Sequence, residues 1–459
     1  MVTTNTKSTA AVQVSDSGKG NYGPALTVLT TLFFIWGSLT SLNDVLIPFA
    51  QNVFNLSLAT SFLIQTAFFF AYFVFSFPSA KIIDWIGYKR AIIVGLSTMV
   101  AACLLVYPAA KIPSFPFFLT ALLILAAGIT VLQVAANPYV AVLGRPETAS
   151  SRLNLTQAFN SLGTAVFPWV GAKLILGESV TAAAQSASQD AVIKLYVYFF
   201  AILLVLLAIL FAVFRLPKME AAEHRIGEKV GDSIWKHPNL IFGAIGIFVY
   251  VGAEVAIGSS ISNYLALSNI GHFASNISDP AARYVAAKSA AARYISLYWG
   301  GAMVGRFIGS AVLQKVKTSR VLAFCSIIAT VLVTISVFSG GHVAMWSLLS
   351  IGLFNSIMFP CIFTSGIAEL GPLTGDGSGV LNTAIVGGAV IPYIVGKLAD
   401  MINHSYYPSM VQGETSWGQG IHYAVLVGAL CYLYILFYAV SGSKPNSERY
   451  GLAKAEARS

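Results

Sequence analysis

Long apolar runs alternate with short polar stretches along most of the chain. A helix of about 20 apolar residues spans the hydrocarbon core of a bilayer, so each run of this length predicts a transmembrane helix. We predict about twelve such helices, at residues 27–49, 60–82, 91–109, 117–140, 153–176, 192–214, 240–265, 292–313, 321–339, 345–367, 378–399 and 420–441. The pattern indicates an all-α polytopic membrane protein that is embedded in a lipid bilayer.

The composition agrees with this fold class. The chain has 459 residues, of which 56% are hydrophobic and only 10% charged, whereas a soluble protein is about 25% charged. The net charge of +9 does not indicate nucleic-acid binding, because the basic residues fall in short loops between apolar runs. The four cysteines lie inside apolar segments without metal-ligand spacing, so we expect buried packing residues and no disulfide.

Lysine and arginine concentrate in alternate connections and in both tails, which places those segments in the cytoplasm. The connection at 266–290, with Arg283 and Lys288, fits this alternation least well. The first 23 residues lack an apolar core behind a basic start, so we expect no cleavable signal peptide. We predict a monomer in the bacterial inner membrane with both termini cytoplasmic.

An internal repeat divides the chain. AVFPW at 165–169 reappears as AVIPY at 389–393, 224 positions later, and Arg90 matches Arg320, 230 positions later. We therefore predict a tail at 1–23, a six-helix half at 24–214, a linker at 215–238, a second half at 239–441 and a tail at 442–459. Two parallel halves with a site between them resemble the major facilitator arrangement.

An acidic residue, Asp44, follows Asn43 deep in the first predicted helix. A carboxylate at the centre of a membrane helix costs about 2.5–3.5 kcal/mol and normally faces a partner or a watery cavity. The default interpretation is a functional site, and the alternative is a structural pair with a neighbouring helix.

Other polar residues in the predicted spans form a small set. Gln133 and Asn137 are four apart and share one helix face. Any single amide more often bonds across helices than binds a ligand. As a set, these neutral donors and acceptors suit the hydroxyls of a sugar. The further members are Asn154, Gln157, Asn160, Glu254, Asn355 and Asn382, with Trp36, Phe68, Phe69, Phe70, Tyr72, Tyr298 and Trp299 as aromatic residues to stack on the sugar.

When the first and seventh predicted helices are aligned at Gly37 and Gly252, Glu254 lies at the level of Leu39, five positions before Asp44. At 1.5 Å per residue it should sit about 7–8 Å nearer the cytoplasm, out of contact with Asp44. A sugar ligand, a gate residue and a structural pair remain open interpretations for this side chain.

The sequence AKIIDWIGYKR at 80–90 resembles the major facilitator signature between the second and third helices. Asp84, Gly87, Lys89 and Arg90 match, and we predict a latch whose acid meets a basic residue or a helix N-terminus across the half boundary. Ala80 and Trp85 depart from the signature, and the second-half copy has lost the acid. The alternative is an ordinary basic cytoplasmic loop.

Arg306 lies near the cytoplasmic end of the eighth predicted helix. Its long side chain either snorkels to the interface or serves as a partner in the latch, and the sequence leaves both interpretations open.

Three motifs then resemble the fucose–glucose–galactose permease family: NDVLIP at 43–48, LQVAANPY at 132–139 and LTQAFNSLG at 155–163. The resemblance is closest to the glucose/galactose branch and implies a sugar–cation symporter that works by alternating access. Fucose permeases carry a second acid where this chain has Gln133. Asp44 therefore either holds Na⁺ with neutral oxygens beside it or acts as a protonatable group.

We predict import of a hexose, glucose or galactose, coupled to Na⁺ or H⁺, with no cofactor beyond a bound Na⁺ at Asp44. The predicted cation residues are Asp44, Gln133 and Asn137, and the predicted sugar residues are Asn43, Gln133, Asn137, Gln157, Asn160, Glu254, Asn382 and Trp36. The alternatives are an uncoupled facilitator, a symporter of fucose or an amino sugar, and a membrane glycosyltransferase. An ATP-driven pump is disfavoured because the chain has no phosphate-binding loop.

Overall fold

The computed structural model describes residues 22–56, 60, 63–112, 114–176, 189–217, 233–406 and 418–449, and every regular element in these ranges is helical. The first bundle consists of α1 (Gly23–Ser41), α2 (Asn43–Phe54), α4 (Leu63–Lys111), α5 (Phe115–Val142), α6 (Ala149–Gly171) and α8 (Ile202–Val213). The second bundle begins with α9 (Pro238–Leu265), α10 (Pro280–Ala292), α11 (Ile295–Val312), α12 (Thr318–Phe338) and α13 (Gly341–Asn355). It continues with α14 (Met358–Gly366), α15 (Thr374–Thr383), α16 (Gly387–Tyr406), α17 (Gly418–Ala424), α18 (Val427–Phe437) and α19 (Asn446–Arg449).

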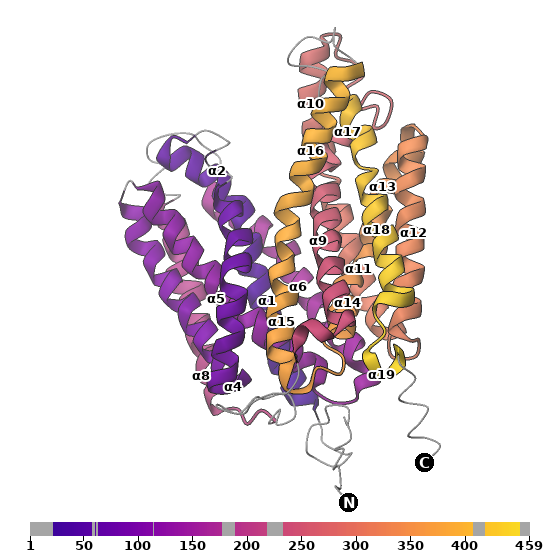
Figure 1. Ribbon diagram of the computed structural model, residues 1–459. Coiled ribbons are helices and arrows are strands. Elements are labelled where there is room, and N and C mark those ends of the chain that lie inside the picture. The colour runs from indigo at the N-terminus through magenta and orange to yellow at the C-terminus, as the bar shows by residue number, and fades with distance from the viewer. Residues whose placement is uncertain are drawn as a thin grey trace, which may run out of the picture.

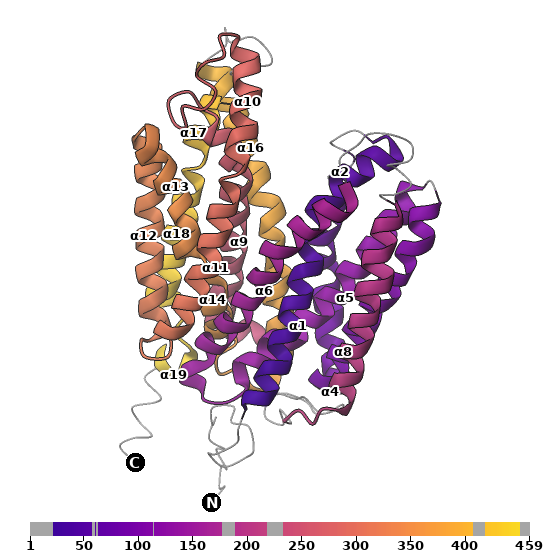
Figure 2. The same cartoon turned by 180° about the vertical axis from the view of Figure 1, so that it is seen from behind.

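The two bundles meet at one end of the molecule and diverge toward the other (Figure 1). We call the joined end, where α1 begins and α19 lies, the base, and the opposite end, which carries α2 and α10, the top. The view from behind shows the same divergence (Figure 2). The predicted tails and linker fall largely outside the described residues, so their boundaries stay predictions.

The predicted spans all overlap helical segments. Among the described residues, nine helices are long and apolar enough to cross a membrane. One of them, Leu63–Lys111, covers two predicted spans because the helix is interrupted only at Gly87. The two remaining spans correspond to α6 and α11, which are more polar. Both contact the opposite bundle.

The first predicted span, 27–49, is not one straight helix. α1 ends at Ser41 and α2 starts at Asn43, with Leu42 between them. The hydroxyls of Thr40 and Ser41 donate back to the carbonyls of Trp36 and Ser38, each at 3.0 Å. Such back-bonding bends helices, and it places the Asn43–Asp44 pair in the first turn after a helix junction.

Gly87 also has a conformational role. Its φ of 77° and ψ of 165° break α4 in the middle of the predicted latch sequence. Glycine adopts this region readily, whereas a side chain would strain it. The predicted loop between the second and third spans is therefore a tight turn at Gly87, where one helix ends and the next begins.

Candidate functional site

Two seams join the bundles at the base. The α6 seam packs α6 against α11 and α14, with the start of α12 beside them, and the α15 seam packs α15 against α4 and α5. In the α6 seam, the hydroxyl of Ser150 lies 2.9 Å from that of Thr318 and 2.6 Å from that of Thr364. Ser151 donates to the carbonyl of Ser310 at 2.7 Å. These bonds use the first turn of α6, and further contacts with α11 follow along α6 as far as Ser161.

The α15 seam is closely packed. The hydroxyl of Ser378 donates to the carbonyl of Val134 across the boundary at 2.8 Å. A Cβ atom on Gly379 would lie 3.0 Å from the Cβ of Ala80 and 3.2 Å from the carbonyl oxygen of Ser76. A larger residue at 379 would therefore separate α15 from α4.

The predicted acid, Asp84, lies at this seam. Lys81 places its ammonium 3.1 Å from Asp84 and 3.0 Å from Asp376 of the second bundle. Asp84 also lies by the N-terminal turn of α15, because a Cβ on Gly375 would be 3.5 Å from its Oδ1. A carboxylate is favoured near a helix N-terminus. The geometry fits the predicted contacts of the acid, and its role as a latch stays a prediction.

Sequence reasoning missed Lys81 and Asp376 as members of this cluster. The available signal was the spacing of Lys81 three residues before Asp84, which places both on one helix face. Of the basic residues that were predicted, Lys89 donates within its own bundle, to the carbonyl of Ala212 at 2.9 Å. Arg90 is exposed beyond the break at Gly87.

A buried charge pair lies above the α6 seam. Arg306 Nη2 is 3.7 Å from Glu254 Oε1, and the two side chains are 13% and 11% exposed. Arg306 also donates to the hydroxyl of Ser161 and to the carbonyl of Gln157 at 3.5 Å, both on α6. Its Nε donates to the carbonyl of Ser356 at 3.2 Å. The guanidinium thus bridges the bundles from a buried position, and the snorkelling interpretation does not fit.

The polar stripe of α6 divides between two neighbours. Asn154 donates to the carbonyl of Arg306 at 2.7 Å, across the α6 seam. Asn160 donates instead to the carbonyl of Phe33 on α1 at 3.0 Å. Trp36 is buried on the same helix with its ring 4.5 Å from that of Phe33. Gln157 lies between Asn154 and Asn160 along α6 and is buried.

Two predicted residues of α5 have different surroundings. Gln133 donates to the hydroxyl of Tyr72 at 2.6 Å. Asn137 is fully buried, and neither its Nδ2 nor its Oδ1 bonds to any described residue. The Oδ1 of Asn43 is likewise buried without such a partner. Because a buried unsatisfied polar group costs about 1–3 kcal/mol, these amides indicate a place for a ligand, an ion or water.

The second bundle holds the remaining predicted residues. Asn382 is buried in α15 and donates to the carbonyl of Ser378 at 2.9 Å, while its Oδ1 has no partner among the described residues. Asn355 donates to the hydroxyls of Tyr298 and Tyr432 at 2.8 and 3.3 Å. Tyr298 is fully buried in this cluster.

The side chain of Asp44 lies outside the described part of the structure, so the proposed Na⁺ at this residue stays a prediction. The described residues contain no group of three or more His, Cys, Asp or Glu side chains that could hold a metal ion. All four cysteines are buried and free, which confirms the prediction of packing residues without disulfides.

Residues 28–393 match the family model of the Major Facilitator Superfamily. The chain belongs to this superfamily. It is 48% identical over 428 residues to a protein named glucose/galactose transporter from Brucella abortus (strain 9-941), covering 93% of this chain and 96% of the relative. It is 30% identical over 458 residues to the L-fucose-proton symporter of Escherichia coli (strain K12), covering 95% and 96%.

A solved structure agrees with this assignment. The chain is similar to a crystal structure of the major facilitator transporter FucP in the outward conformation, with a TM-score of 0.76 and 28% identity over 92% of this chain and 99% of that one. The predicted fold class and the predicted family resemblance are confirmed. The relatives and the fold are those of transporters, so the chain is a multi-pass membrane transporter and not an enzyme.

Proposed function

We propose that this protein imports a hexose, glucose or galactose, together with a cation, by alternating access. The observation that carries the proposal is Asn137, a fully buried amide with neither polar atom paired to a described residue, on a helix of a sugar-transporter fold. A polyhydroxy ligand supplies both the donors and the acceptors that such an amide lacks. The names of the Brucella and Escherichia coli relatives support a monosaccharide as the substrate.

In this proposal the described conformation faces outward. The termini lie in the cytoplasm of a bacterial inner membrane, so the two seams at the base close the cytoplasmic side. The diverging top (Figure 1) admits the sugar between the bundles. Transport then requires the α6 and α15 seams to part while the bundles approach each other at the top.

The sugar residues in this proposal are Asn43, Gln133, Asn137, Gln157 and Asn160 of the first bundle. They are joined by Trp36 as a stacking surface and by Glu254 and Asn382 of the second bundle. A sugar that bonds to both bundles would offset the hydrogen bonds that break as the base opens, which lowers the barrier to the inward-facing state.

The coupling cation in this proposal binds at Asp44, with Gln133 and Asn137 as neutral neighbours. Na⁺ favours oxygen ligands of this kind, and a proton would instead neutralise the carboxylate before the bundles rock. The alternative function, an uncoupled facilitator, differs only in what Asp44 does.

Sugar uptake into proteoliposomes tests the proposal. An imposed inward Na⁺ or H⁺ gradient should drive accumulation of galactose or glucose above the external concentration. Asp44→Asn should abolish accumulation and retain counterflow of labelled sugar. Accumulation by the Asp44→Asn protein would contradict the coupling role, and absence of any hexose counterflow by the unmodified protein would contradict the substrate class.

A further inference from the structure

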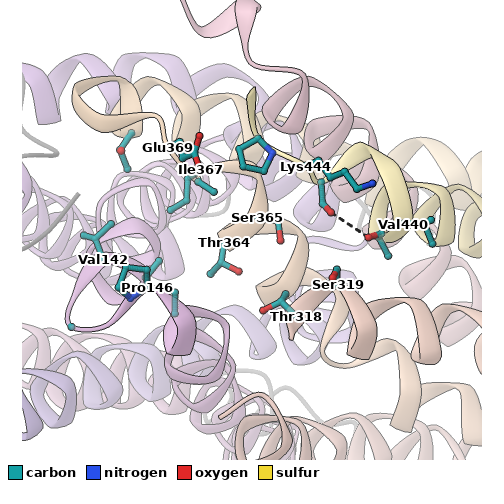
Figure 3. Close-up of a pocket in the computed structure, with 18 residues that line it drawn as sticks. Val142, Pro146, Thr318, Ser319, Thr364, Ser365, Ile367, Glu369, Val440 and Lys444 are labelled. Atoms are coloured by element: carbon teal, nitrogen blue, oxygen red, sulfur yellow. Dashed lines mark hydrogen bonds between the residues drawn. The ribbon is translucent and has the colours of Figure 1, made fainter. Parts of the chain in front are cut away.

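A cavity of about 440 Å³ lies at the base on the α6 seam (Figure 3). The end of α5, including Val142, and the connection to α6, including Pro146, form its first-bundle wall. The second bundle contributes the start of α12, the end of α14 and the segment after α18. Because both bundles line this cavity, it exists only while the base is closed.

The lining is part apolar and part polar, and it carries both signs of charge. It contains Glu369, Lys444 and the hydroxyls of Thr318, Ser319, Thr364, Ser365, Thr374 and Ser443. Figure 3 shows the side chains of Thr364 and Ser365 between those of Glu369 and Thr318 around one space. The carboxylate of Glu369 would repel an anionic ligand, and the ammonium of Lys444 would repel a cationic one. A neutral polyhydroxy molecule can use the hydrogen-bond donors and acceptors of the lining together. The volume is within the range of about 300–1,000 Å³ found for small-molecule sites.

The internal repeat shows how the two seams differ in charge. The offset of 224 aligns Ser150, at the start of α6, with Thr374, at the start of α15. The offset of 230 aligns Lys81 with Ala311 and Asp84 with Gln314. The α6 seam therefore lacks the lysine and the acid that close the α15 seam.

Arg152 and Asp376 are equivalent positions of the repeat, because they are separated by the same offset of 224. Arg152 turns back into its own bundle and donates to the carbonyls of Val140 and Ala141 at 3.3 and 2.7 Å. No described charge of α6 thus crosses into the cavity at this level, and hydroxyl groups line it instead. At the base, the α6 seam thus has hydroxyl contacts and this cavity, whereas the α15 seam has the ion pairs of Lys81.

We propose that this cavity is a second sugar site, which binds the imported hexose from the base side and holds the two bundles together there. The inference rests on the proposed function, because it identifies the ligand as the transported product. Binding to a cavity lined by both bundles favours the base-closed state, so hexose that accumulates in the cytoplasm slows further import without competing at the transport site.

Equilibrium binding of labelled D-galactose to the purified full-length chain in lipid nanodiscs tests the proposal. We expect two sites per chain in the unmodified protein and one in Ser365→Leu, whose added methyl groups fill the cavity. Ser319→Leu, on the opposite wall, is an independent second variant. Gln157→Ala should lose the other site and keep this one, and Ser339→Leu, at a partly exposed serine just after the far end of α12, should keep both.

A conformational readout separates binding from its effect. Glu147 and Gln314 are exposed on opposite bundles at the base. The distance between spin labels at these two positions should become shorter when galactose is added to Gln157→Ala. The shift should disappear when Ser365→Leu is added to Gln157→Ala.

Specific outcomes would overturn the inference. A single galactose site in a protein that still accumulates hexose would show that the cavity is only part of the exit path. Binding of glucose 6-phosphate with no binding of galactose in Gln157→Ala would show an anion site. Failure of the unmodified protein to transport hexose would refute the proposed function instead, so the two failures are distinguishable.

Discussion

The replacement Arg306→Met should destabilise the protein and favour opening at the base. It removes the cation 3.7 Å from Glu254, whose side chain is only 11% exposed. Breaking a fully buried ion pair costs about 3–5 kcal/mol, and an exposed pair is worth about 0–1 kcal/mol. Because this pair is nearly buried but too long for a hydrogen bond, we expect a loss of about 2–4 kcal/mol in the free energy of unfolding.

The same replacement removes the bonds from the guanidinium to Ser161 and Gln157, which exist only while α11 and α6 are together. Hydrogen bonds to charged groups are worth about 1.5–3 kcal/mol. The ratio of base-closed to base-open molecules should therefore fall by about tenfold to a hundredfold, at 1.4 kcal/mol per factor of ten.

Thermal unfolding in nanodiscs measures the first effect, and electron-spin distances across the base measure the second. Arg320→Met is the matched control, since Arg320 is exposed and should change neither. Glu254→Gln combined with Arg306→Met should recover most of the stability, because the buried carboxylate is then neutral, but should not recover the closed base. The reasoning is refuted if Arg306→Met is as stable as Arg320→Met, or if the double variant is no more stable than Arg306→Met.

Three further predictions concern the α15 seam and the buried amides. Lys81→Gln should lower the base-closed population by at most about fivefold, and spin-label distances should show this effect at low salt and not at 1 M NaCl, because the pair is solvent-exposed. Gly379→Ala should slow uptake and open the base, whereas Gly396→Ala, whose Cβ would meet nothing within 4 Å, should leave uptake unchanged; equal uptake rates would contradict the close packing. Asn137→Ala should abolish sugar binding measured by calorimetry without lowering the unfolding temperature. Asn355→Ala, which loses two hydrogen bonds to tyrosines, should lower the unfolding temperature. A large loss of stability in Asn137→Ala would indicate that this amide has a structural role.

The approximate positions of the membrane helices could be predicted because each one must satisfy its backbone internally and needs a long apolar run. The junction at Leu42 could not, since it depends on hydroxyls that bond to the helix backbone rather than to other side chains. The break at Gly87 had a signal, a glycine in a polar turn between two predicted helices, but the sequence did not show that the turn is reduced to this one residue.

The pairing of Glu254 with Arg306 shows the limit of sequence reasoning at the site. Opposite charges deep in two apolar spans indicate that each needs a partner, yet their separation of 52 positions carries no information on how α9 and α11 face each other. The position of Arg306 against α6 depends in turn on how the bundles dock, which hydrophobic patterning leaves undetermined.

The two seams differ because duplication preserved the helices and not the charges. A latch that closed both seams with ion pairs would add to the energy that transport must overcome at every cycle. At the base, the ammonium of Lys81 on the α15 seam and neutral hydroxyls on the α6 seam make bonds worth about 1 kcal/mol each, and Arg306 adds charged hydrogen bonds to α6. Bonds of this size are few enough for a bound sugar to offset, so the loss of the second acid at Gln314 keeps the closed base reversible.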